Sequence, residues 1–453
     1  MKIILAQPMG YLFSIGGAHK ANRVLMEGLA ERGHFCRVLS PINFTGSLSA
    51  LGEDMRHEQL REQLAQRGIN LTSTSEGDSF QLKGVDVRLP IDYVTLCAQF
   101  YEHVRKVDPT WILVSEDTAH LILAAALEAA PSRVVYISHS PSSLPFGPDC
   151  FSPDSSKEEL LGRAAAIITV SDYMKDYIKR YSGLESVVLR FPVYGAGPYP
   201  VFGRFDFDNG FVTMINPCAI KGISILLELA RRFPQIRFAC VVTWGTVKSE
   251  LKALEELPNM TILRPSENMD EVLCQTRVLV APSLWGEAFG QVVVDAMLRG
   301  IPVLASNSGG LPEAKLGVDY VLPVKQVERY EEFRNEKSQL DHRAVIPHQD
   351  IEPWAAALGQ LVSDRECYER VSKQSRDAAL EFVSRLDIDT FEKFLKELAP
   401  TEKVNGQEAQ PDRRMPRADK VDNLVGNLLP VDRALLKERL KGRLREAIAE
   451  RRS

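Results

Sequence analysis

The segment from Arg277 to Glu313 constrains the fold more than any other part of the chain. It consists, in order, of the apolar run RVLVAPS, the glycine-containing turn LWGEAFG, the helix-like run QVVVDAMLRG and a second apolar run, IPVLAS. Short apolar runs of this kind are typical of strands buried on both faces of a parallel sheet, and a helix between two of them is the usual crossover. The segment therefore predicts an α/β fold with a parallel sheet.

Two carboxylates lie eight residues apart in this segment, Glu287 in the turn and Asp295 in the helix. A turn between a strand and the next helix lies at the carboxyl edge of an open sheet, where backbone N–H groups can receive an anionic or hydroxyl-rich ligand. Asp295 stands about two helical turns further along, on the same side of the helix. Carboxylate oxygens accept strong hydrogen bonds from hydroxyl groups, so this pair suits sugar and ribose hydroxyls.

The same alternation extends over most of the chain and divides into two series. The first series predicts strands in IILAQ, FCRVLS, TWILVSE, RVVYISHS, AAIITVS and SVVLRFP, and the second in FVTMINP, IRFACVVT, MTILRPS, RVLVAPS, IPVLAS and YVLPV. Between the two series, VYGAGPYPVFGRFDFDNG is rich in proline and glycine and marks a domain boundary. A polar section over residues 41–83, with one helical piece and a hairpin around SEGDS, is expected to sit over the cleft.

Length and composition limit the class of protein. A chain of 453 residues suits two domains of roughly 200 residues, and its net charge of −5 argues against a nucleic-acid partner. The seven cysteines lack metal-site spacing and are expected to be buried reduced thiols. The first apolar run is too short for a signal peptide and no segment reaches the length of a membrane span, so we expect a cytoplasmic protein without integral membrane contact.

The segment 277–313 resembles the E-x7-E signature of the family 4 retaining glycosyltransferases, or glycosyl transferases group 1, which have the GT-B fold. The PS, GEAFG, G-x-PV and GG-x-PE elements match in order and spacing, with Asp295 where the family has a second glutamate. The resemblance implies two Rossmann-like doubly wound domains facing each other across a cleft. The domains it implies are an N-terminal acceptor-binding domain (1–192), a connector (193–209), a C-terminal nucleotide-sugar-binding domain (210–372) and a helix that crosses back to the N-terminal domain (373–400).

Beyond residue 400 the chain changes character. Residues 401–427 are polar and predict a flexible linker. Residues 428–453 carry leucine and isoleucine at four-residue spacing among Lys and Arg, which predicts an amphipathic helix. This helix could dock on its own domain, bind a protein partner or lie on a membrane surface. Part of it is also similar to segments near the ends of nonribosomal peptide and polyketide assembly-line proteins, which favours a natural-product acceptor.

Gly16 and Gly17 separate the first strand from a helix, and glycines at such a junction let the backbone approach a ligand. In the resembled family this loop lies beneath the donor phosphates or beside the acceptor, and a tight strand-to-helix turn is the less favoured alternative. His139 follows RVVYIS at a strand's carboxyl end, from which it can hydrogen-bond a sugar hydroxyl. The family has a histidine near the transferred sugar at a similar place, and a bond to a neighbouring carbonyl is the alternative.

INPCAIKG resembles the family's G-R-x-x-x-x-K-G segment, in which Arg and Lys bracket the donor diphosphate. Lys221 retains the lysine, whereas Asn216 replaces the arginine and can donate only a neutral hydrogen bond. Cations that are already in position stabilise the charge of a leaving diphosphate, and Lys221 is the candidate for this role. The alternative is a solvated lysine before a helix. Trp244 is either a core aromatic or part of the site. The remaining donor-binding residues implied by the resemblance are Gly245, Arg264, Ala288, Phe289 and Gly290.

Two D-x-D strings, at Asp206/Asp208 and Asp387/Asp389, are reminiscent of the metal motif of GT-A transferases. The first lies in the connector and the second in a helical stretch, so we ascribe both to chance. Because GT-B enzymes need no catalytic divalent ion, the resemblance implies neither a metal nor another cofactor.

The chain is therefore expected to be a retaining, metal-independent glycosyltransferase that moves a sugar from a nucleoside-diphosphate donor to an acceptor. The resemblance implies catalytic roles for His139, Lys221 and Glu287, and a ribose contact for Asp295. One alternative is a pseudoenzyme that binds a nucleotide sugar and acts as a scaffold. Others are a transferase for lipid or polysaccharide acceptors and, with less support, an epimerase or phosphorylase on the same fold.

Overall fold

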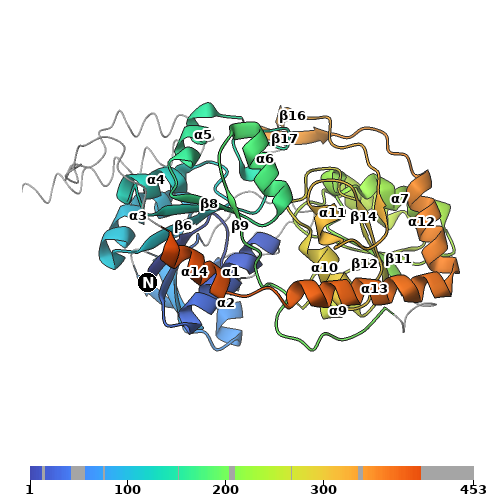
Figure 1. The fold of residues 1–453 in the computed structure, drawn as a ribbon, viewed down its shortest axis with the longest axis horizontal. Helices are drawn as coiled ribbons and strands as arrows, with labels where there is room; N and C mark the ends of the chain where they lie inside the picture. Colours follow the sequence, from blue (N-terminus) through green and yellow to red (C-terminus); the bar gives the residue numbers. More distant parts are fainter. Residues whose placement is uncertain are drawn as a thin grey trace, which may run out of the picture.

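The computed structural model describes residues 1–12, 16–41, 57–74, 77–150, 153–203, 210–266, 268–334 and 340–398, without the side chains of 57–60, 332–334 and 340–342. These residues form two α/β units, each built around its own sheet (Figure 1). The predicted linker and amphipathic helix beyond residue 400 lie outside the described residues.

The first unit contains a nine-stranded sheet with the order β3-β4-β5-β2-β1-β6-β7-β8-β9. β4 runs antiparallel to β3 and β5, and the other neighbouring strands are parallel. In register, Ile3 of the central strand faces Cys36 on one side and Trp111 on the other. The elements are β1 (Lys2–Ala6), α1 (Gly17–Glu31), β2 (Phe35–Leu39), α2 (His57–Gln66), β3 (Thr72–Thr74), β4 (Gly77–Leu82), β5 (Val85–Leu89), α3 (Tyr93–Val107), β6 (Trp111–Ser115), α4 (Leu121–Ala129), β7 (Val134–Ser138), η1 (Pro141–Ser143), α5 (Ser155–Gly162), β8 (Ala166–Thr169), α6 (Asp172–Ser182) and β9 (Val187–Val188).

The second unit contains a six-stranded parallel sheet with the order β12-β11-β10-β13-β14-β15. Its elements are β10 (Phe211–Ile215), η2 (Ala219–Lys221), α7 (Ile223–Arg232), β11 (Phe238–Val241), α8 (Lys248–Glu255), β12 (Met260–Leu263), α9 (Asp270–Leu273), β13 (Thr276–Ala281), α10 (Gln291–Leu298), β14 (Val303–Ser306), α11 (Leu311–Ala314), β15 (Val321–Leu322), β16 (Arg329–Arg334), β17 (Leu340–Val345), α12 (Glu352–Ser363), α13 (Arg365–Val383) and α14 (Asp389–Glu397).

The apolar runs form strands because the middle of each sheet is covered on both faces. Every residue of β6 and β7 is buried, and the same holds for β11 and β14 in the second unit. Fully burying a Val, Leu or Ile side chain contributes roughly 1.5–3 kcal/mol, so such runs fix the strands strongly. All twelve predicted runs are strands, which confirms the α/β class.

The polar section over residues 41–83 is described only in part. Its predicted helical piece includes α2, and its predicted hairpin is formed by β3 and β4, although residues 75–76 are outside the described part. The β3-β4 hairpin extends the edge of the first sheet beyond β5.

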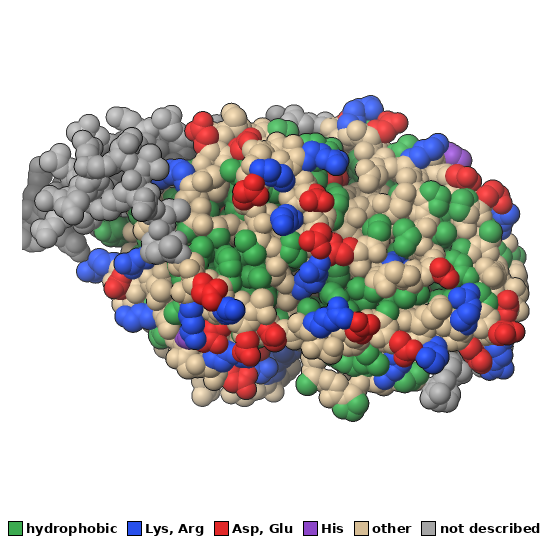
Figure 2. Space-filling view, viewed as in Figure 1, with side chains coloured by type: hydrophobic (Ala, Val, Ile, Leu, Met, Phe, Trp, Pro, Cys, Tyr) green, Lys and Arg blue, Asp and Glu red, His purple; other side chains and the backbone are tan. Residues whose placement is uncertain are grey.

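The side chains on the face shown in Figure 2 carry both signs of charge, interspersed over the described part of the surface. Six of the cysteines are buried or half-buried free thiols, but Cys274 is exposed, contrary to expectation, because it follows the short α9 at the surface before β13. Among the helices described, none is long and apolar enough to cross a membrane.

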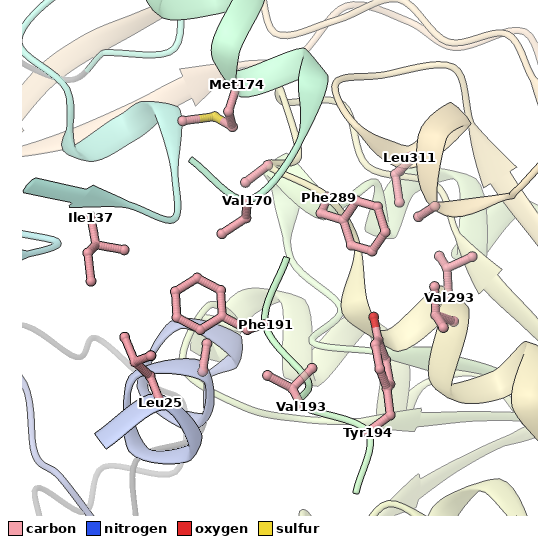
Figure 3. Packing of buried hydrophobic residues seen from close by; sticks show 14 of the residues in the cluster. Leu25, Ile137, Val170, Met174, Phe191, Val193, Tyr194, Phe289, Val293 and Leu311 are labelled. Carbon is pink, nitrogen blue, oxygen red and sulfur yellow. The ribbon is translucent and has the colours of Figure 1, made fainter. Parts of the chain in front are cut away.

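The two units meet through buried apolar side chains. Val170 of the first unit and Phe289 and Leu311 of the second belong to one buried cluster, in which Phe191 lies beside Leu25 and Ile137 of the first unit (Figure 3). Because this packing continues one hydrophobic core across the junction, the loops of the two units are held close together at the carboxyl edges of both sheets.

The last two helices connect the units a second time. The helix expected over 373–400 is in fact interrupted, since α13 ends at Val383 and α14 begins at Asp389. α14 lies against the first unit, where Trp111 Nε1 donates to the backbone oxygen of Leu395 at 2.7 Å.

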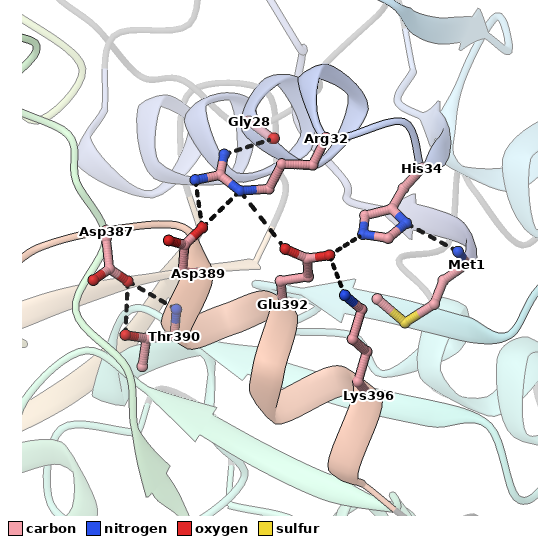
Figure 4. Close-up of polar contacts among 9 residues, drawn as sticks. All are labelled: Met1, Gly28, Arg32, His34, Asp387, Asp389, Thr390, Glu392 and Lys396. Atoms are coloured by element: carbon pink, nitrogen blue, oxygen red, sulfur yellow. Dashed lines mark hydrogen bonds and ion pairs between the residues drawn. The ribbon is translucent and has the colours of Figure 1, made fainter.

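Figure 4 shows the polar contacts that hold α14 in place. Asp389 accepts from Arg32 at 2.7 Å, and Asp387 accepts from the backbone and hydroxyl of Thr390. Both carboxylates of this D-x-D string therefore have structural partners, and the described residues contain no cluster suited to a metal ion. Asp206 and Asp208 lie outside the described residues.

The antiparallel hairpin of β16 and β17 was not predicted. In Figure 1 it lies near α6 of the first unit, and the electrostatic influence of Asp149 on Tyr330 agrees with this proximity.

Candidate active site

The centre of the candidate site is an ion pair between Lys221, at the end of η2, and Glu287, in the loop after β13. Lys221 Nζ donates to Glu287 Oε1, and Ser283 Oγ donates to the same oxygen at 2.8 Å. The ammonium also lies 4.8 Å from the centroid of the Trp285 ring, which adds a cation–π attraction. Lys221 is therefore a fixed cation and not a solvated side chain.

The surroundings of Glu287 keep it ionised. Burial by itself would raise its pKa, but the Lys221 cation and the hydrogen bonds from Lys221 and Ser283 hold the pKa below its usual value. Glu287 can therefore accept hydrogen bonds from hydroxyl groups without first losing a proton.

The loop that carries Glu287 is fixed by the loop after β14. Gly310 N donates to Glu287 O at 2.6 Å, and Ser308 Oγ donates to Trp285 O at 2.5 Å. Gly290, which caps α10, has φ of 99°, a conformation that only glycine adopts at little cost. The GEAFG and GG-x-PE elements thus form one structural unit at the sheet edge.

Ala288 and Phe289 are buried between the two units. Ser171 Oγ of the first unit donates to Ala288 O, and the Phe289 ring stacks on Phe382 with 5.6 Å between centroids. Their side chains therefore serve packing, and the polar contacts they offer a ligand come from their backbone.

Asp295 lies on α10 and is almost completely buried. Arg299 Nη1 donates to its Oδ1 at 3.2 Å, while Arg299 Nε binds Asp270 at 2.7 Å. Burial raises the pKa of Asp295, although Lys20 and Arg299 act in the opposite direction. The structure thus pairs Asp295 with Arg299 and does not join it to the Lys221–Glu287 pair.

Asn216 directly follows β10 and has a positive φ of 56°. Its Oδ1 accepts from Gly245 N at 3.0 Å, which turns the amide nitrogen the other way. Within the described part of the chain, that buried Nδ2 has no hydrogen-bond partner, so it is available as a neutral donor. A Cβ at Gly245 would lie 2.8 Å from Cys218 Sγ, so this close approach requires glycine.

The other predicted residues of the second unit follow neighbouring strands. Trp244 is 42% exposed, so it is not a core aromatic, and Arg264 is exposed after β12. Both lie on the same sheet edge as Asn216, because β10, β11 and β12 are parallel neighbours.

The glycine pair of the first unit faces the second unit. A Cβ at Gly17 would lie 2.8 Å from Gln291 Oε1, at the start of α10. The N-termini of α1 and α10 therefore lie near each other across the junction, and the capping glycines Gly16 and Gly290 supply no side-chain cap.

His139 belongs to a buried hydrogen-bond chain. Gln7 Nε2 donates to the backbone oxygens of Met9 and Gly10, so Gln7 Oε1 must accept from Asn22 Nδ2 at 2.9 Å. Asn22 Oδ1 in turn accepts from His139 Nε2 at 2.9 Å. This order fixes the hydrogen of His139 on Nε2.

The other ring nitrogen of His139, Nδ1, is buried and has no partner among the residues described. Burial lowers the pKa of the imidazole to about 3, with a smaller contribution from His19. His139 is therefore neutral, and Nδ1 is an acceptor suited to a hydroxyl group. Its partner is an asparagine side chain, so the alternative of a neighbouring carbonyl does not hold.

Several residues at the junction were missed by the sequence analysis. Asp149 and Tyr173 of the first unit contact the Glu287 loop, and Glu313 of the second unit contacts Arg190 and α6. Glu313 belongs to the GG-x-PE element, and Asp149 lies between η1 and α5. Tyr173 and Arg190 carry no motif that marks them.

Comparison with known proteins agrees with this architecture. Residues 208–364 match the family model described as glycosyl transferases group 1. This part of the second unit is therefore similar to the group 1 glycosyltransferases. A D-inositol 3-phosphate glycosyltransferase of Corynebacterium jeikeium is 28% identical over 207 residues, which cover 42% of this chain and 43% of that protein. An exopolysaccharide phosphotransferase of Streptomyces coelicolor is 22% identical over 72% of this chain and 32% of its own length. The chain thus matches less than half the length of either relative.

Solved structures show that the chain has the GT-B fold. The sucrose-phosphate synthase of Thermosynechococcus elongatus aligns with a TM-score of 0.61 at 16% identity, over 88% of this chain and 99% of that one. HepE of Anabaena, in complex with UDP and glucose, aligns with a TM-score of 0.56 at 17% identity, over 87% and 98% of the two chains. The predicted fold class is confirmed.

Proposed function

We propose that this chain is a group 1 glycosyltransferase that transfers a sugar from a nucleoside-diphosphate sugar to an acceptor held mainly by the first unit, with retention of anomeric configuration. The observation that carries the proposal is the Lys221–Glu287 pair at the carboxyl edge of the second sheet. It combines a fixed cation for a diphosphate with a carboxylate for sugar hydroxyls. The complex of HepE with UDP and glucose supports a donor of this class.

The proposed chemistry needs no protein nucleophile. The bond between the sugar and the diphosphate breaks, the acceptor oxygen bonds to the sugar on the same face, and the departing diphosphate takes up the acceptor proton. Negative charge grows on the diphosphate, where Lys221 Nζ and Asn216 Nδ2 stabilise it. Because Lys221 supplies this charge, we expect the reaction to need no divalent ion and no other cofactor.

The remaining residues position the substrates. Glu287 accepts hydrogen bonds from the sugar, His139 Nδ1 accepts from a hydroxyl of the sugar or acceptor, and Asp295 contacts the ribose. The acceptor class rests on the brief assembly-line similarity of the C-terminal segment, which favours a natural product or other small molecule over a lipid or polysaccharide.

The function is tested with the purified full chain and a panel of nucleotide sugars, with nucleoside diphosphate release followed by NMR. We expect slow release from one donor, lost in Glu287→Ala and retained in the matched variant Glu256→Ala, whose carboxylate is exposed on the same unit. Turnover by Glu287→Ala at the wild-type rate would contradict the proposal.

A scaffold that binds a nucleotide sugar without transferring it is the second candidate. Asn216 in place of an arginine favours it, because one fixed cation is absent from the diphosphate site. The scaffold would be supported if a nucleotide sugar causes NMR shifts on binding but no nucleoside diphosphate is released. Release must also be absent when a saturating donor is combined with a library of acceptors.

A further inference from the structure

The first unit contacts the Glu287 loop through Asp149. Gly286 N donates to Asp149 Oδ1 at 3.2 Å, and Tyr173 Oη lies 3.4 Å from Asp149 Oδ2. Asp149 is itself anchored to α6, since its backbone N–H donates to Tyr177 Oη at 3.1 Å. The residue next to Glu287 is thus held by groups that belong to the other sheet.

Residues of the first unit leave no space for a side chain at Gly286. Its φ is outside the left-handed range, so its backbone conformation suits any residue. A Cβ there would nevertheless lie well inside 3.0 Å of both Tyr173 Oη and Asp149 Oδ2. A side chain at this position is excluded by the approach of the first unit and not by the fold of the second.

A second contact joins the units on the other side of the same loop. Glu313 Oε2 accepts from the backbone N–H groups of Asp172 and Tyr173 at 3.0 and 3.4 Å, and Arg190 Nη2 donates to Glu313 Oε1 at 2.5 Å. The Glu313 carboxylate thus occupies the N-terminus of α6, where the helix dipole favours negative charge. Glu313 follows Gly310, whose N–H holds the backbone of Glu287.

We propose that Asp149 and Glu313 are positioning residues that place the Glu287 loop for transfer only when the two units are closed, and that Gly286 is the contact point that permits closure. This inference rests on the proposed function. It assigns Tyr173 and Arg190 to the same closure contact, from the side of the first unit. The diphosphate groups Lys221 and Asn216 belong to the second unit, and the partners that hold them, Glu287 and Gly245, belong to the same unit.

The test is Gly286→Ala in the full chain, with Gly359→Ala as matched control. Gly359 lies in α12 of the same unit, where an added Cβ meets nothing closer than 3.8 Å. In Gly286→Ala we expect transfer kcat to fall about 100-fold, the size of effect that a misplacement of about 1 Å produces. The Kd for the nucleoside diphosphate should stay within about threefold of wild type, because the diphosphate groups are untouched.

A second-site variant separates closure from local damage. Tyr173→Phe removes the nearest atom and also frees Asp149 Oδ2 from its contact with the Tyr173 hydroxyl. Asp149 Oδ2, 2.5 Å from the added Cβ, is the end of a side chain that can then turn away, and the nearest ring atom would lie at 3.1 Å. We expect Gly286→Ala/Tyr173→Phe to recover transfer at least about tenfold over Gly286→Ala. Wild-type kcat in Gly286→Ala, or an absence of recovery in the double variant, would overturn the inference.

Two further measurements test the inference, and the second of them does not depend on the proposed activity. Asp149→Asn retains an oxygen that accepts from Gly286 N, whereas Asp149→Ala does not, so kcat should fall further in Asp149→Ala. Small-angle scattering should show a larger radius of gyration for Gly286→Ala than for Gly359→Ala. Equal radii of gyration would overturn the inference. If the radii differ but the wild-type protein uses no nucleotide sugar, the proposed function alone would be overturned.

Discussion

Lys221 and Glu287 form an ion pair across the carboxyl edge of the second sheet, with only 17% and 16% of their side chains exposed. Because water solvates this pair poorly, the attraction between the two charges offsets the cost of burying each of them. The pair therefore links the stability of the second unit to the proposed binding of a diphosphate and a sugar.

Removing one partner should damage both stability and transfer. Breaking a fully buried pair costs about 3–5 kcal/mol because the remaining charge is uncompensated, and this partly exposed pair should cost somewhat less. We expect Lys221→Met and Glu287→Gln each to lower Tm and to reduce kcat/KM by about 10- to 100-fold, the worth of a hydrogen bond to a charged group.

The double variant Lys221→Met/Glu287→Gln separates the two effects. It removes both charges, so Tm should return toward wild type while transfer stays low. Thermal unfolding and donor kinetics on the same four proteins measure this. Transfer restored together with Tm would show that the pair is only structural.

Asp295 offers a test of the ribose contact. Its pairing with Arg299 means that Asp295→Asn weakens a buried ion pair and should lower Tm. If Asp295 also accepts from the ribose, wild type should bind the nucleoside diphosphate more tightly than its 2′-deoxy analogue by about tenfold, and Asp295→Asn should lose that preference. Calorimetric titration with both nucleotides decides it, and an unchanged preference in the variant would remove Asp295 from the donor site.

Glu116 predicts a distinctive dependence of stability on pH. Burial raises its pKa from 4.5 to about 7, against the hydrogen bonds that it accepts from His139 N and Ser143 Oγ. Between these two values the folded chain keeps the proton and the unfolded chain has lost it, so this group lowers stability as pH rises from about 4.5 to about 7. Glu116→Gln retains an accepting oxygen and should flatten the curve of unfolding free energy over this range. The same slope in wild type and variant would contradict the assignment.

The strands that could be predicted from the sequence are those that are buried on both faces of a sheet. The strands on both sides of Ile3 and Val212 are mainly apolar runs, because the centre of each sheet is covered on both faces. β5 and the β16-β17 hairpin have the mixed sequences VDVRL, RYEEFR and LDHRAV, so they lack that signal and were missed.

The residues of the candidate site also divide into those that the sequence predicts and those that it does not. Motif positions such as Lys221 and Glu287 could be predicted because both lie next to buried strands of one unit. The contacts of Asp149 and Tyr173 with Gly286 could not, since they depend on how the two units meet. No local pattern in the sequence of either unit records that approach.

The buried chain from Gln7 through Asn22 to His139 leads to a prediction about tautomer and charge. Asn22 donates to Gln7 and to Ser115 Oγ, both at 2.9 Å, so its oxygen faces His139. In Asn22→Ala these three buried partners lose their hydrogen bond, at about 1–3 kcal/mol for each group left unpaired, so we expect a clear loss of unfolding free energy in urea. The exposed Glu31→Ala should change it by less than about 0.5 kcal/mol.

Asn22→Asp tests the same chain by charge. In wild type, His139 should stay neutral well below pH 6, since its pKa is lowered to about 3, and its ¹⁵N shifts should place the hydrogen on Nε2. A carboxylate in place of the Asn22 amide favours the imidazolium and should raise the pKa of His139. Assignment with His139→Gln identifies the resonance, and a wild-type His139 that titrates near 6.5 would contradict the structure. A neutral His139 also requires that its Nδ1 acts by accepting a hydrogen bond, so transfer at pH 5 to 7 should show no protonation step from this residue.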